Sequence, residues 1–336
     1  MTAPLHLLLG PVGHGVRRCA ADLARAVGAA TATDPRSLAD GDPVHLHLTD
    51  RVVASDPASA ADRVEAWAAR CPLTVTLHDV PQPTDGAAFA ARRAAYARIV
   101  RAVDGWAVCS EHERELVHDL LDGATGRPGR VLPLPLEPAP AARLPAPARL
   151  PAGRTVVLLG WLYPGKGHAE VVRALASLPP SARGPAPLTV VSAGAVSPGH
   201  DDLVAALGEE ALVAGLGFQV TGWLGEDEAL AWLQHADVPV AGHRNVSASA
   251  SVNSWVAAGR RPLVRRSRYA EEVERLRPGC HVLWRDEELA DRLAAALADP
   301  ALTRLAGPPP GPDLATVAAA YVAWWRSLDR ARSGAA

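Results

Sequence analysis

The sequence predicts an α/β protein with two Rossmann-like, doubly wound domains and an interdomain cleft. Short apolar runs alternate with amphipathic segments along nearly the whole chain, which is typical of parallel sheets covered by helices on both faces. The chain has 336 residues, enough for about two domains with sizeable cores. Residues 136–154 are rich in Pro and Ala and can form neither a regular helix nor an inner strand, so they mark a domain boundary.

These features divide the chain into an N-terminal domain (1–136), a Pro/Ala-rich linker (137–153), a second domain (154–312) and a terminal helix (313–330). The terminal segment is amphipathic, with one apolar stripe formed by Val317, Tyr321, Trp324 and Leu328.

Apolar runs bounded by Gly, Pro or polar residues predict the strands. In the first half these runs are 5–9, 44–48, 73–77, 105–109 and 131–134, and in the second half they are 156–159, 188–192, 220–221, 238–241, 262–264 and 282–284. Helical periodicity or composition predicts helices over 59–70, 87–102, 226–235, 252–258, 287–297 and 316–330. Three further helices are expected after Gly15, after Ser110 and after Gly167.

Composition narrows the range of expected partners and of cellular location. The 34 basic and 36 acidic residues leave a net charge of −2, and no polybasic tract stands out, so nucleic acid is not an expected partner. Leu5 to Leu9 is too short for a signal peptide or a membrane span, so we expect a cytoplasmic protein, for which peripheral contact with a membrane surface stays open. The four cysteines are far apart without metal-ligand spacing and are expected to be buried, reduced thiols.

The stretch 155–175 predicts a phosphate-binding turn. An apolar strand is followed by a loop with Gly160, Gly165 and Gly167 around Lys166, and then by a helix. Glycines let a ligand approach the backbone, the helix N-terminus offers free N–H groups, and the lysine adds a full charge. The loop lacks the Walker spacing. The alternative is an ordinary turn with a solvated lysine.

Histidines and glycines mark a second candidate region in the first half. His78 follows a predicted strand, and ligands of open α/β sheets bind beyond the carboxyl ends of strands. His78 is therefore a candidate functional residue, with a plain structural histidine as the alternative. His45 and His47 are two residues apart and share one face of a strand; without a third ligand, a core or rim position is favoured over metal ligation.

Several motifs, taken in order, carry a family resemblance. The loop GPVGHG is followed by VHLHLTD, TVTLHDV and WAVCSEHE, and VLPLPL precedes the linker. After the linker come GWLYPGKGHAEVVRAL, VTGWLGEDEALAWLQHADVPV and WVAAGRRPLV. Over nearly its whole length the chain resembles the GT-B glycosyltransferases, in particular the large retaining family four.

The resemblance implies roles for particular residues. Lys166 matches the lysine that contacts the diphosphate of a nucleotide-sugar donor, and His78 matches a histidine beside the transferred sugar. Gly13 and Gly15 match a loop that approaches the donor, and the terminal helix would cross back onto the N-terminal domain. Such enzymes bind the donor mostly on the C-terminal domain and the acceptor mostly on the N-terminal domain.

The chain also departs from the family pattern. Trp161 stands where the family usually carries an Arg, and Val246 and Ser254 stand where it carries two glutamates. A serine-rich loop and its neighbours offer substitutes for the missing donor contacts: Ser247, Ser249, Ser251, Asn253 and Ser254 as hydrogen-bonding groups, and Arg244, Arg260, Arg261, Arg265 and Arg266 as charges.

The expected function is that of a metal-independent, retaining glycosyltransferase with catalytic residues His78 and Lys166. It would need no cofactor beyond its nucleotide-diphosphate sugar, and its acceptor would be a lipid, a metabolite or a glycan. The resemblance implies metal independence, because GT-B enzymes as a group tend to work without a metal ion. A non-catalytic nucleotide-sugar-binding or partner protein is the second hypothesis. A NAD-linked enzyme is disfavoured because GxGxxG with a downstream acidic residue is missing.

Overall fold

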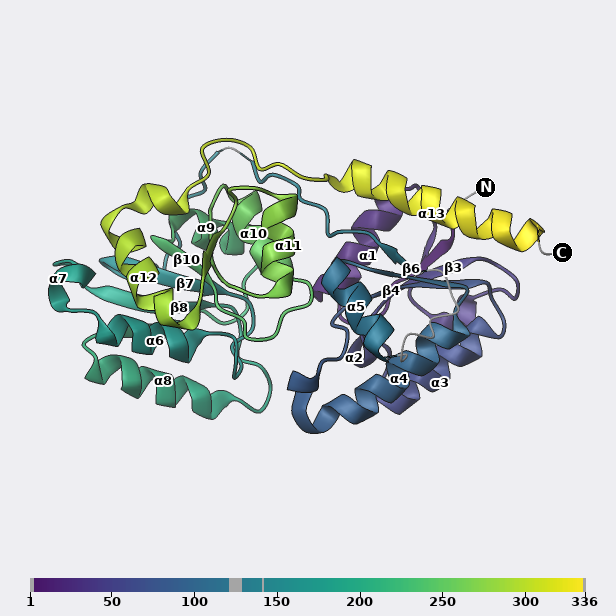
Figure 1. Ribbon diagram of the computed structural model, residues 1–336, viewed down its shortest axis with the longest axis horizontal. Helices are drawn as coiled ribbons and strands as arrows, with labels where there is room; N and C mark the ends of the chain where they lie inside the picture. The colour runs from purple at the N-terminus through teal and green to yellow at the C-terminus, as the bar shows by residue number, and fades with distance from the viewer. Residues whose placement is uncertain (1–2, 121–128, 141, 335–336) are drawn as a thin grey trace. The chain divides into compact units, whose positions relative to one another are not determined.

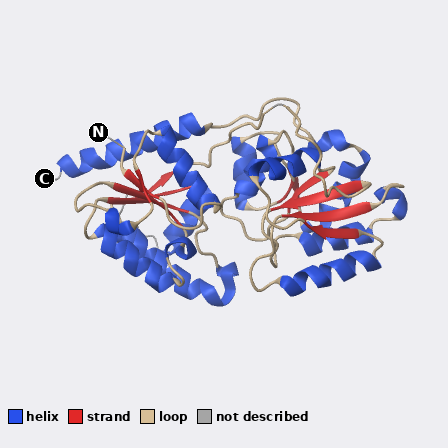
Figure 2. Cartoon of the chain, turned by 180° about the vertical axis from the view of Figure 1, so that it is seen from behind, coloured by secondary structure: helices blue, strands red, loops and turns tan. Residues whose placement is uncertain are grey.

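Two parallel six-stranded sheets, one in each of two units, form the framework of the computed structural model (Figure 1). The structure describes residues 3–120, 129–140 and 142–334, with side chains up to residue 331. One unit, called unit 1, comprises residues 1–135 and 312–336, and the other, unit 2, comprises 136–311. Helices flank the strands on both sides in each unit (Figure 2), which confirms the predicted doubly wound α/β fold. Among the described residues, no helix has the length and apolar character needed to span a membrane.

In unit 1 the strand order is β2-β1-β3-β4-β5-β6, and every pairing is parallel. The strands are β1 (Leu5–Leu7), β2 (Thr31–Ala32), β3 (Val44–Leu48), β4 (Leu73–Leu77), β5 (Gly105–Val108) and β6 (Gly129–Val131). The helices are α1 (Gly15–Ala26), α2 (Asp50–Val53), α3 (Pro57–Ala68), α4 (Phe89–Ala102), α5 (Glu111–Leu120) and α13 (Leu314–Gly334), with short 3₁₀ turns at Pro35–Ser37 and Pro83–Ala88.

The alternation within β3 and β4 decides what each face of this sheet contacts. Leu46, Leu48, Val75 and Leu77 join the core beneath α3 and α4. The intervening histidines and threonines point to the other face, which α1 and α13 cover (Figure 1). The expected apolar stripe of α13 is buried there, and its Tyr321 hydroxyl lies 2.9 Å from Thr76 Oγ1.

In unit 2 the strand order is β12-β11-β10-β7-β8-β9, again parallel throughout. The strands are β7 (Arg154–Leu159), β8 (Leu188–Ala193), β9 (Gly217–Val220), β10 (Val238–Ala241), β11 (Leu263–Arg265) and β12 (Val282–Trp284). The helices are α6 (His168–Ser177), α7 (Pro180–Arg183), α8 (Asp201–Val213), α9 (Glu226–His235), α10 (Ala250–Ala257), α11 (Arg268–Leu276) and α12 (Leu289–Ala298), with 3₁₀ turns at Asp286–Glu288 and Pro300–Thr303.

Side chains of β7 also alternate between two cores. Val156 and Leu158 pack with α6 and α12, whereas Val157 packs with Trp232 of α9 and Trp255 of α10. Burial on both faces explains why this strand is almost uninterrupted in apolar residues.

Residues 137–153, which were expected to form a linker, belong to unit 2. The described residues among them are held by unit 2: Ala139 N–H donates to the Ala257 carbonyl at 2.8 Å, and Leu144 N–H donates to Gln234 Oε1 at 2.8 Å. The described residues of this segment form no helix or strand before β7, as its prolines require, and most of them are exposed on that unit.

Some predicted boundaries are wrong for identifiable reasons. The last strand of unit 1 is Gly129–Val131 rather than 131–134, because Pro133 and Pro135 have no N–H for the ladder. The ladder ends with Leu132 N–H donating to the Val108 carbonyl at 2.8 Å.

Candidate functional site

The carboxyl ends of β7 and β10 form the topological switch point of unit 2. These two strands are neighbours; from β7 the chain continues to β8 on one side, and from β10 it continues to β11 on the other. Ligands of open α/β sheets bind at such a point. The loops that leave it are 160–167, with the predicted lysine turn, and 242–249, with the serine-rich stretch.

Two glycines let these loops touch. A Cβ added to Gly167 would lie 2.7 Å from the Gly242 Cα, and the φ of Gly167 is +107°, a left-handed conformation that favours glycine. A backbone bond from Arg244 N–H to the Gly165 carbonyl, 2.9 Å long, ties the loops together. The glycines around Lys166 therefore bring the second loop close, which fits a tight, ligand-facing turn.

Lys166 is buried at this junction, with only 5% of the residue exposed. Its Nζ lies 2.6 Å from Nε2 of His243, and a Cβ added to Gly160 would lie 3.1 Å from the same Nζ. Burial lowers the pKa of Lys166 to about 7, and burial together with the nearby Lys166 charge holds the pKa of His243 well below its usual value. His243 is thus neutral and accepts a hydrogen bond from the lysine. The alternative of a solvated lysine is wrong.

The N-terminus of α10 points its polar groups at the same place. Ser249 caps the helix by accepting a hydrogen bond from Val252 N–H at 3.3 Å, and its Oγ lies 3.0 Å from that of Ser251. The Ser251 hydroxyl in turn lies 3.5 Å from His243 Nε2. Since the first N–H groups of a helix lack partners within it, this end can receive an anion beside the lysine.

Other predicted members of the site are engaged elsewhere. Ser254 donates its hydroxyl hydrogen to the Ala250 carbonyl at 2.9 Å, and Asn253 is buried in α10. Arg244 forms an ion pair with Glu170 of α6 at 2.7 Å. All three residues lie on or beside the serine-rich loop. Their contacts with a nucleotide-sugar donor stay predictions.

The arginines proposed as substitute charges lie at both ends of the sheet: Arg265 and Arg266 at the carboxyl end of β11, and Arg260 and Arg261 before that strand. Arg260 precedes β11 and so lies at the amino end of the sheet, where its guanidinium donates to the carbonyls of Leu233 and Thr303. Arg261 donates to the Leu302 carbonyl, while Arg265 and Arg266 form ion pairs with acidic neighbours. Each of these four guanidinium groups thus has a partner within unit 2, and a role in donor binding stays a prediction.

Two exposed tryptophans lie at the same edge of unit 2. Trp161 follows Gly160 and is 45% exposed, and Trp223, which follows β9, is 62% exposed. Their ring centroids are 6.1 Å apart with a tilt of 51°. The position where the resembling family usually has an Arg thus presents an indole to solvent.

In unit 1, His78 and Asp79 form a held turn at the end of β4. Asp79 has a φ of +53°, which is unusual for a residue other than glycine. Arg92 of α4 donates to the Asp79 carbonyl at 2.8 Å and pairs with its carboxylate at 2.9 Å, while the Tyr96 hydroxyl donates to the His78 carbonyl at 3.1 Å. Arg92 also pairs with buried Asp50, which anchors the turn to the end of β3.

The His78 ring is directed into unit 1. Its Nε2 lies 3.0 Å from His47 Nδ1, and its Nδ1 lies 3.7 Å from the sulfur of Cys109. Burial lowers the pKa of His78 to about 4, so the ring is neutral near pH 7. A substrate contact through a ring nitrogen would require His78 to give up one of these partners. The catalytic role of His78 stays a prediction.

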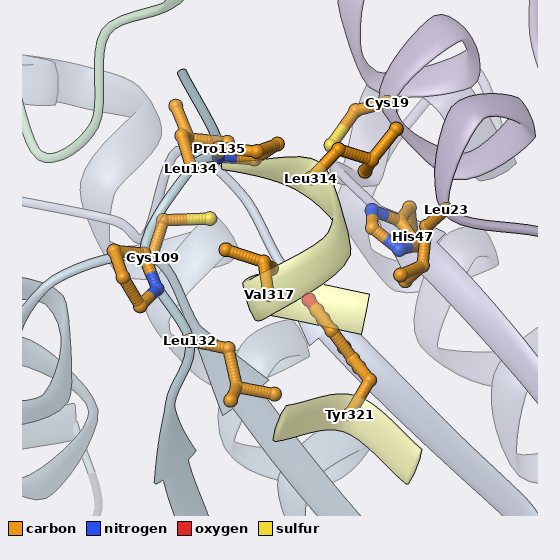
Figure 3. Close-up of a pocket in the computed structure, with 11 residues that line it drawn as sticks. Cys19, Leu23, His47, Cys109, Leu132, Leu134, Pro135, Leu314, Val317 and Tyr321 are labelled. Carbon is orange, nitrogen blue, oxygen red and sulfur yellow. The ribbon is translucent and has the colours of Figure 1, made fainter. Parts of the chain in front are cut away.

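His45 of β3 is a core residue, one of the two settings expected for it. This ring bonds Thr74 and Thr76 at 2.9 and 3.1 Å. His47 is different, because the fold supplies the third potential ligand that the linear spacing lacked: Cys19 of α1 lies beside His47 and His78. Figure 3 shows Cys19 and His47 at a pocket that Cys109 and Tyr321 also line.

Gly13 and Gly15 lie in the loop between β1 and α1. Gly15 begins the helix and is exposed, and His14 caps it through Nδ1, which accepts from Val16 N–H at 3.3 Å. These residues and His78 belong to unit 1, whereas the Lys166 group belongs to unit 2, and each group is formed within its own unit.

His243 is a member of the site that the sequence analysis did not predict, and one further signal for Lys166 was not used. His243 follows a strand end, the same criterion that singled out His78. Lys166 is also the only lysine of the chain; every other residue among the 34 Lys and Arg is arginine. An amine thus stands at the switch point of a protein that otherwise uses guanidinium groups.

Comparison with known proteins defines the fold. No protein-family model and no curated protein matches the chain. Among solved structures, Anabaena HepE in complex with UDP-glucose is similar with a TM-score of 0.64 and 15% identity, over 98% of this chain and 99% of that one. An α,α-trehalose-phosphate synthase (UDP-forming) from Burkholderia vietnamiensis has a TM-score of 0.63 and 16% identity, over 88% and 73%. An E. coli protein of trehalose-6-phosphate, bound with UDP-2-fluoro glucose, has a TM-score of 0.57 and 16% identity, over 87% and 70%.

These likenesses place the chain in a structural class. It has the two-domain GT-B fold of its neighbours, as the order of its sequence motifs predicted.

Proposed function

We propose that this protein is a glycosyltransferase that takes a sugar from a nucleotide-diphosphate sugar. The donor diphosphate binds at the switch point of unit 2, between Lys166 and the N-terminus of α10. UDP-glucose is the first donor to test, because the HepE structure with the same fold holds UDP-glucose.

The observation that carries this proposal is a buried amine without a counter-charge. Among the described residues, no carboxylate lies within ion-pair distance of Lys166, and its partner, His243, is neutral. An uncompensated buried cation is costly, and a bound anion removes that cost. A diphosphate at this position would be held by the ammonium and by the first N–H groups of α10.

The same groups serve the chemistry of transfer. When the bond between the sugar and the diphosphate breaks, negative charge develops on the departing phosphate oxygen. Lys166 and the helix end provide positive charge at that position, so we propose that departure requires no divalent metal ion and no further cofactor. Retention of configuration is proposed from the family resemblance, with His78 and the loop of Gly13 and Gly15 as sugar-side contacts and the acceptor on unit 1.

A second candidate is a nucleotide-sugar-binding protein without turnover. It is favoured by the absence of carboxylates at Val246 and Ser254, where the resembling enzymes have two glutamates. The Ser254 hydroxyl is bonded to the Ala250 carbonyl, so it is a weak substitute for a carboxylate that binds a ribose.

Incubation with a panel of UDP-, GDP- and ADP-sugars separates the two candidates, with released nucleotide and sugar measured by mass spectrometry. We expect slow hydrolysis of one donor in the absence of acceptor, and a loss of about a hundredfold or more in Lys166→Ala. Arg173→Ala on the exposed side of α6 is the matched control and should keep the activity. Tight binding without turnover would favour the second candidate, and the absence of both would reject the two proposals.

A further inference from the structure

Three elements of unit 1 bring a cysteine and two histidines together. Cys19 comes from α1, His47 from the end of β3, and His78 from the residue after β4. One potential ligand atom of each residue lies within 4.8 Å of those of the other two. The Cys19 sulfur and the His47 ring face a common pocket in Figure 3. The sequence positions 19, 47 and 78 show no metal-binding motif, so only the fold reveals the group.

The two imidazoles already have a separation close to that of metal ligands. His47 Nδ1 and His78 Nε2 are 3.0 Å apart. Two nitrogens at about 2.0–2.1 Å from a tetrahedral zinc ion lie roughly 3.4 Å from each other. Without an ion, one of these facing nitrogens carries a proton and donates it, and the other is unprotonated and accepts it.

The surroundings of the rings fit coordination. His78 Nδ1 lies 3.7 Å from the sulfur of Cys109, and histidines that bind metals through one nitrogen commonly contact an outer partner through the other. His47 is only 3% exposed, and its Nε2 has no hydrogen-bond partner among the described residues. The protein thus supplies an outer contact for the His78 ring and none for the Nε2 of His47.

We propose that Cys19, His47 and His78 form a binding site for a zinc-class transition-metal ion. A thiolate with two imidazoles suits Zn²⁺ and disfavours Mg²⁺ and Ca²⁺, which prefer oxygen ligands. Three protein ligands leave a fourth position for water. The bound ion would link α1, β3 and β4, and it would hold the His78 ring inside unit 1. The Lys166 group lies in the other unit, so the metal site is tested independently of the diphosphate contact. An ion bound to His78 would replace the sugar-side contact proposed for that residue.

Cobalt is the spectroscopic probe for this site. The full-length protein, stripped of metal, is titrated with Co²⁺, and a thiolate ligand gives a sulfur-to-cobalt charge-transfer band in the near ultraviolet. We expect the band in the wild type and in Cys71→Ser, which removes another buried cysteine of unit 1. Cys19→Ser should lose the band and bind Zn²⁺ more than about tenfold more weakly, since loss of an outer partner alone costs that much.

A second measurement, cysteine alkylation, can be made on the wild-type protein alone. Zn²⁺ should protect Cys19 of the wild type from alkylation, as followed by peptide mass spectrometry, whereas Mg²⁺ should not. It should also raise the melting temperature of the wild type more than that of Cys19→Ser. The proposal is overturned if the wild type gives no cobalt–sulfur band, or if the band survives unchanged in a folded Cys19→Ser variant.

Discussion

The ammonium nitrogen of Lys166 lies 2.6 Å from Nε2 of His243, deep in the switch point of unit 2. The lysine donates to a neutral ring and not to a carboxylate. Because no carboxylate offsets the effect of burial, burial lowers the pKa of Lys166 to about 7. The protonation state of this amine therefore changes near neutral pH. Four predictions follow from this contact and from the glycine turn around it.

Donor affinity should fall as the pH rises above about 7. The diphosphate binds the ammonium form, so at higher pH binding must also bring a proton to Lys166. The dissociation constant of UDP-glucose should rise by up to about tenfold for each pH unit above the pKa of the free protein. Isothermal titration calorimetry from pH 6 to pH 9 measures this. Lys166→Arg, whose guanidinium stays charged, is the control and should show no such trend.

Two replacements of His243 should show whether donor affinity depends on its hydrogen bond with Lys166 or only on its packing. His243→Leu removes the acceptor of the Lys166 hydrogen bond, whereas His243→Gln keeps an acceptor. A hydrogen bond to a charged group contributes about 1.5–3 kcal/mol, so UDP-glucose affinity at pH 7 should fall roughly ten- to hundredfold in the first variant and much less in the second. Equal affinities in the two variants would show that His243 is only a packing residue.

Alanine substitution at two glycines tests the close approach of loop 160–167 to loop 242–249. Gly165 and Gly167 both have positive φ, at +87° and +107°, but a Cβ at Gly165 has no neighbour nearer than 4.0 Å. Gly165→Ala should cost about 1–2 kcal/mol in the free energy of unfolding. Gly167→Ala adds a clash with Gly242 and should cost about 3 kcal/mol or more, and abolish donor binding. Urea denaturation measures both; equal losses would contradict the loop contact.

Lys166 should also make stability depend on pH. Its folded-state pKa of about 7 is below its ordinary value of 10.5. Between these values the unfolded chain binds a proton that the folded protein does not, so stability should rise with pH across this window. The slope approaches 1.4 kcal/mol per pH unit. Lys166→Met lacks the effect and should be more stable than the wild type at pH 6.5, with a difference that shrinks toward pH 10. Parallel pH profiles would contradict the lowered pKa.

Much of the fold was predictable from local patterns. The strands β3, β4, β10 and β12 and the helix α9 begin and end where the apolar runs and helical spacing place them. The helices α8 and α11 were missed. Only Leu207 and Ala211 are buried in α8, so this helix lacks a wide apolar face. The helix α11 buries Tyr269, Ala270 and Val273, but it is only nine residues long and rich in charged residues.

The candidate site was only partly predictable, because its chemistry depends on neighbours from distant segments. Lys166 and Gly160 were predicted from a strand–loop–helix pattern, and Ser249 and Ser251 from a departure from the family pattern; the two pairs meet at one point. The contact of Lys166 with a residue 77 positions away was not visible in that pattern. The same holds for Cys19, which reaches His47 and His78 only because α1 covers their face of the sheet.

The most direct test uses the single lysine of the chain. Protein grown with ¹³C-lysine gives one side-chain Cε resonance, from Lys166, which NMR can follow from pH 5 to pH 11. We predict a pKa near 7 in the free protein and a clear rise in that pKa, with a shifted resonance, when UDP or UDP-glucose is bound. An ordinary lysine pKa and a resonance that saturating nucleotide leaves unchanged would contradict the assignment of Lys166 to the donor diphosphate.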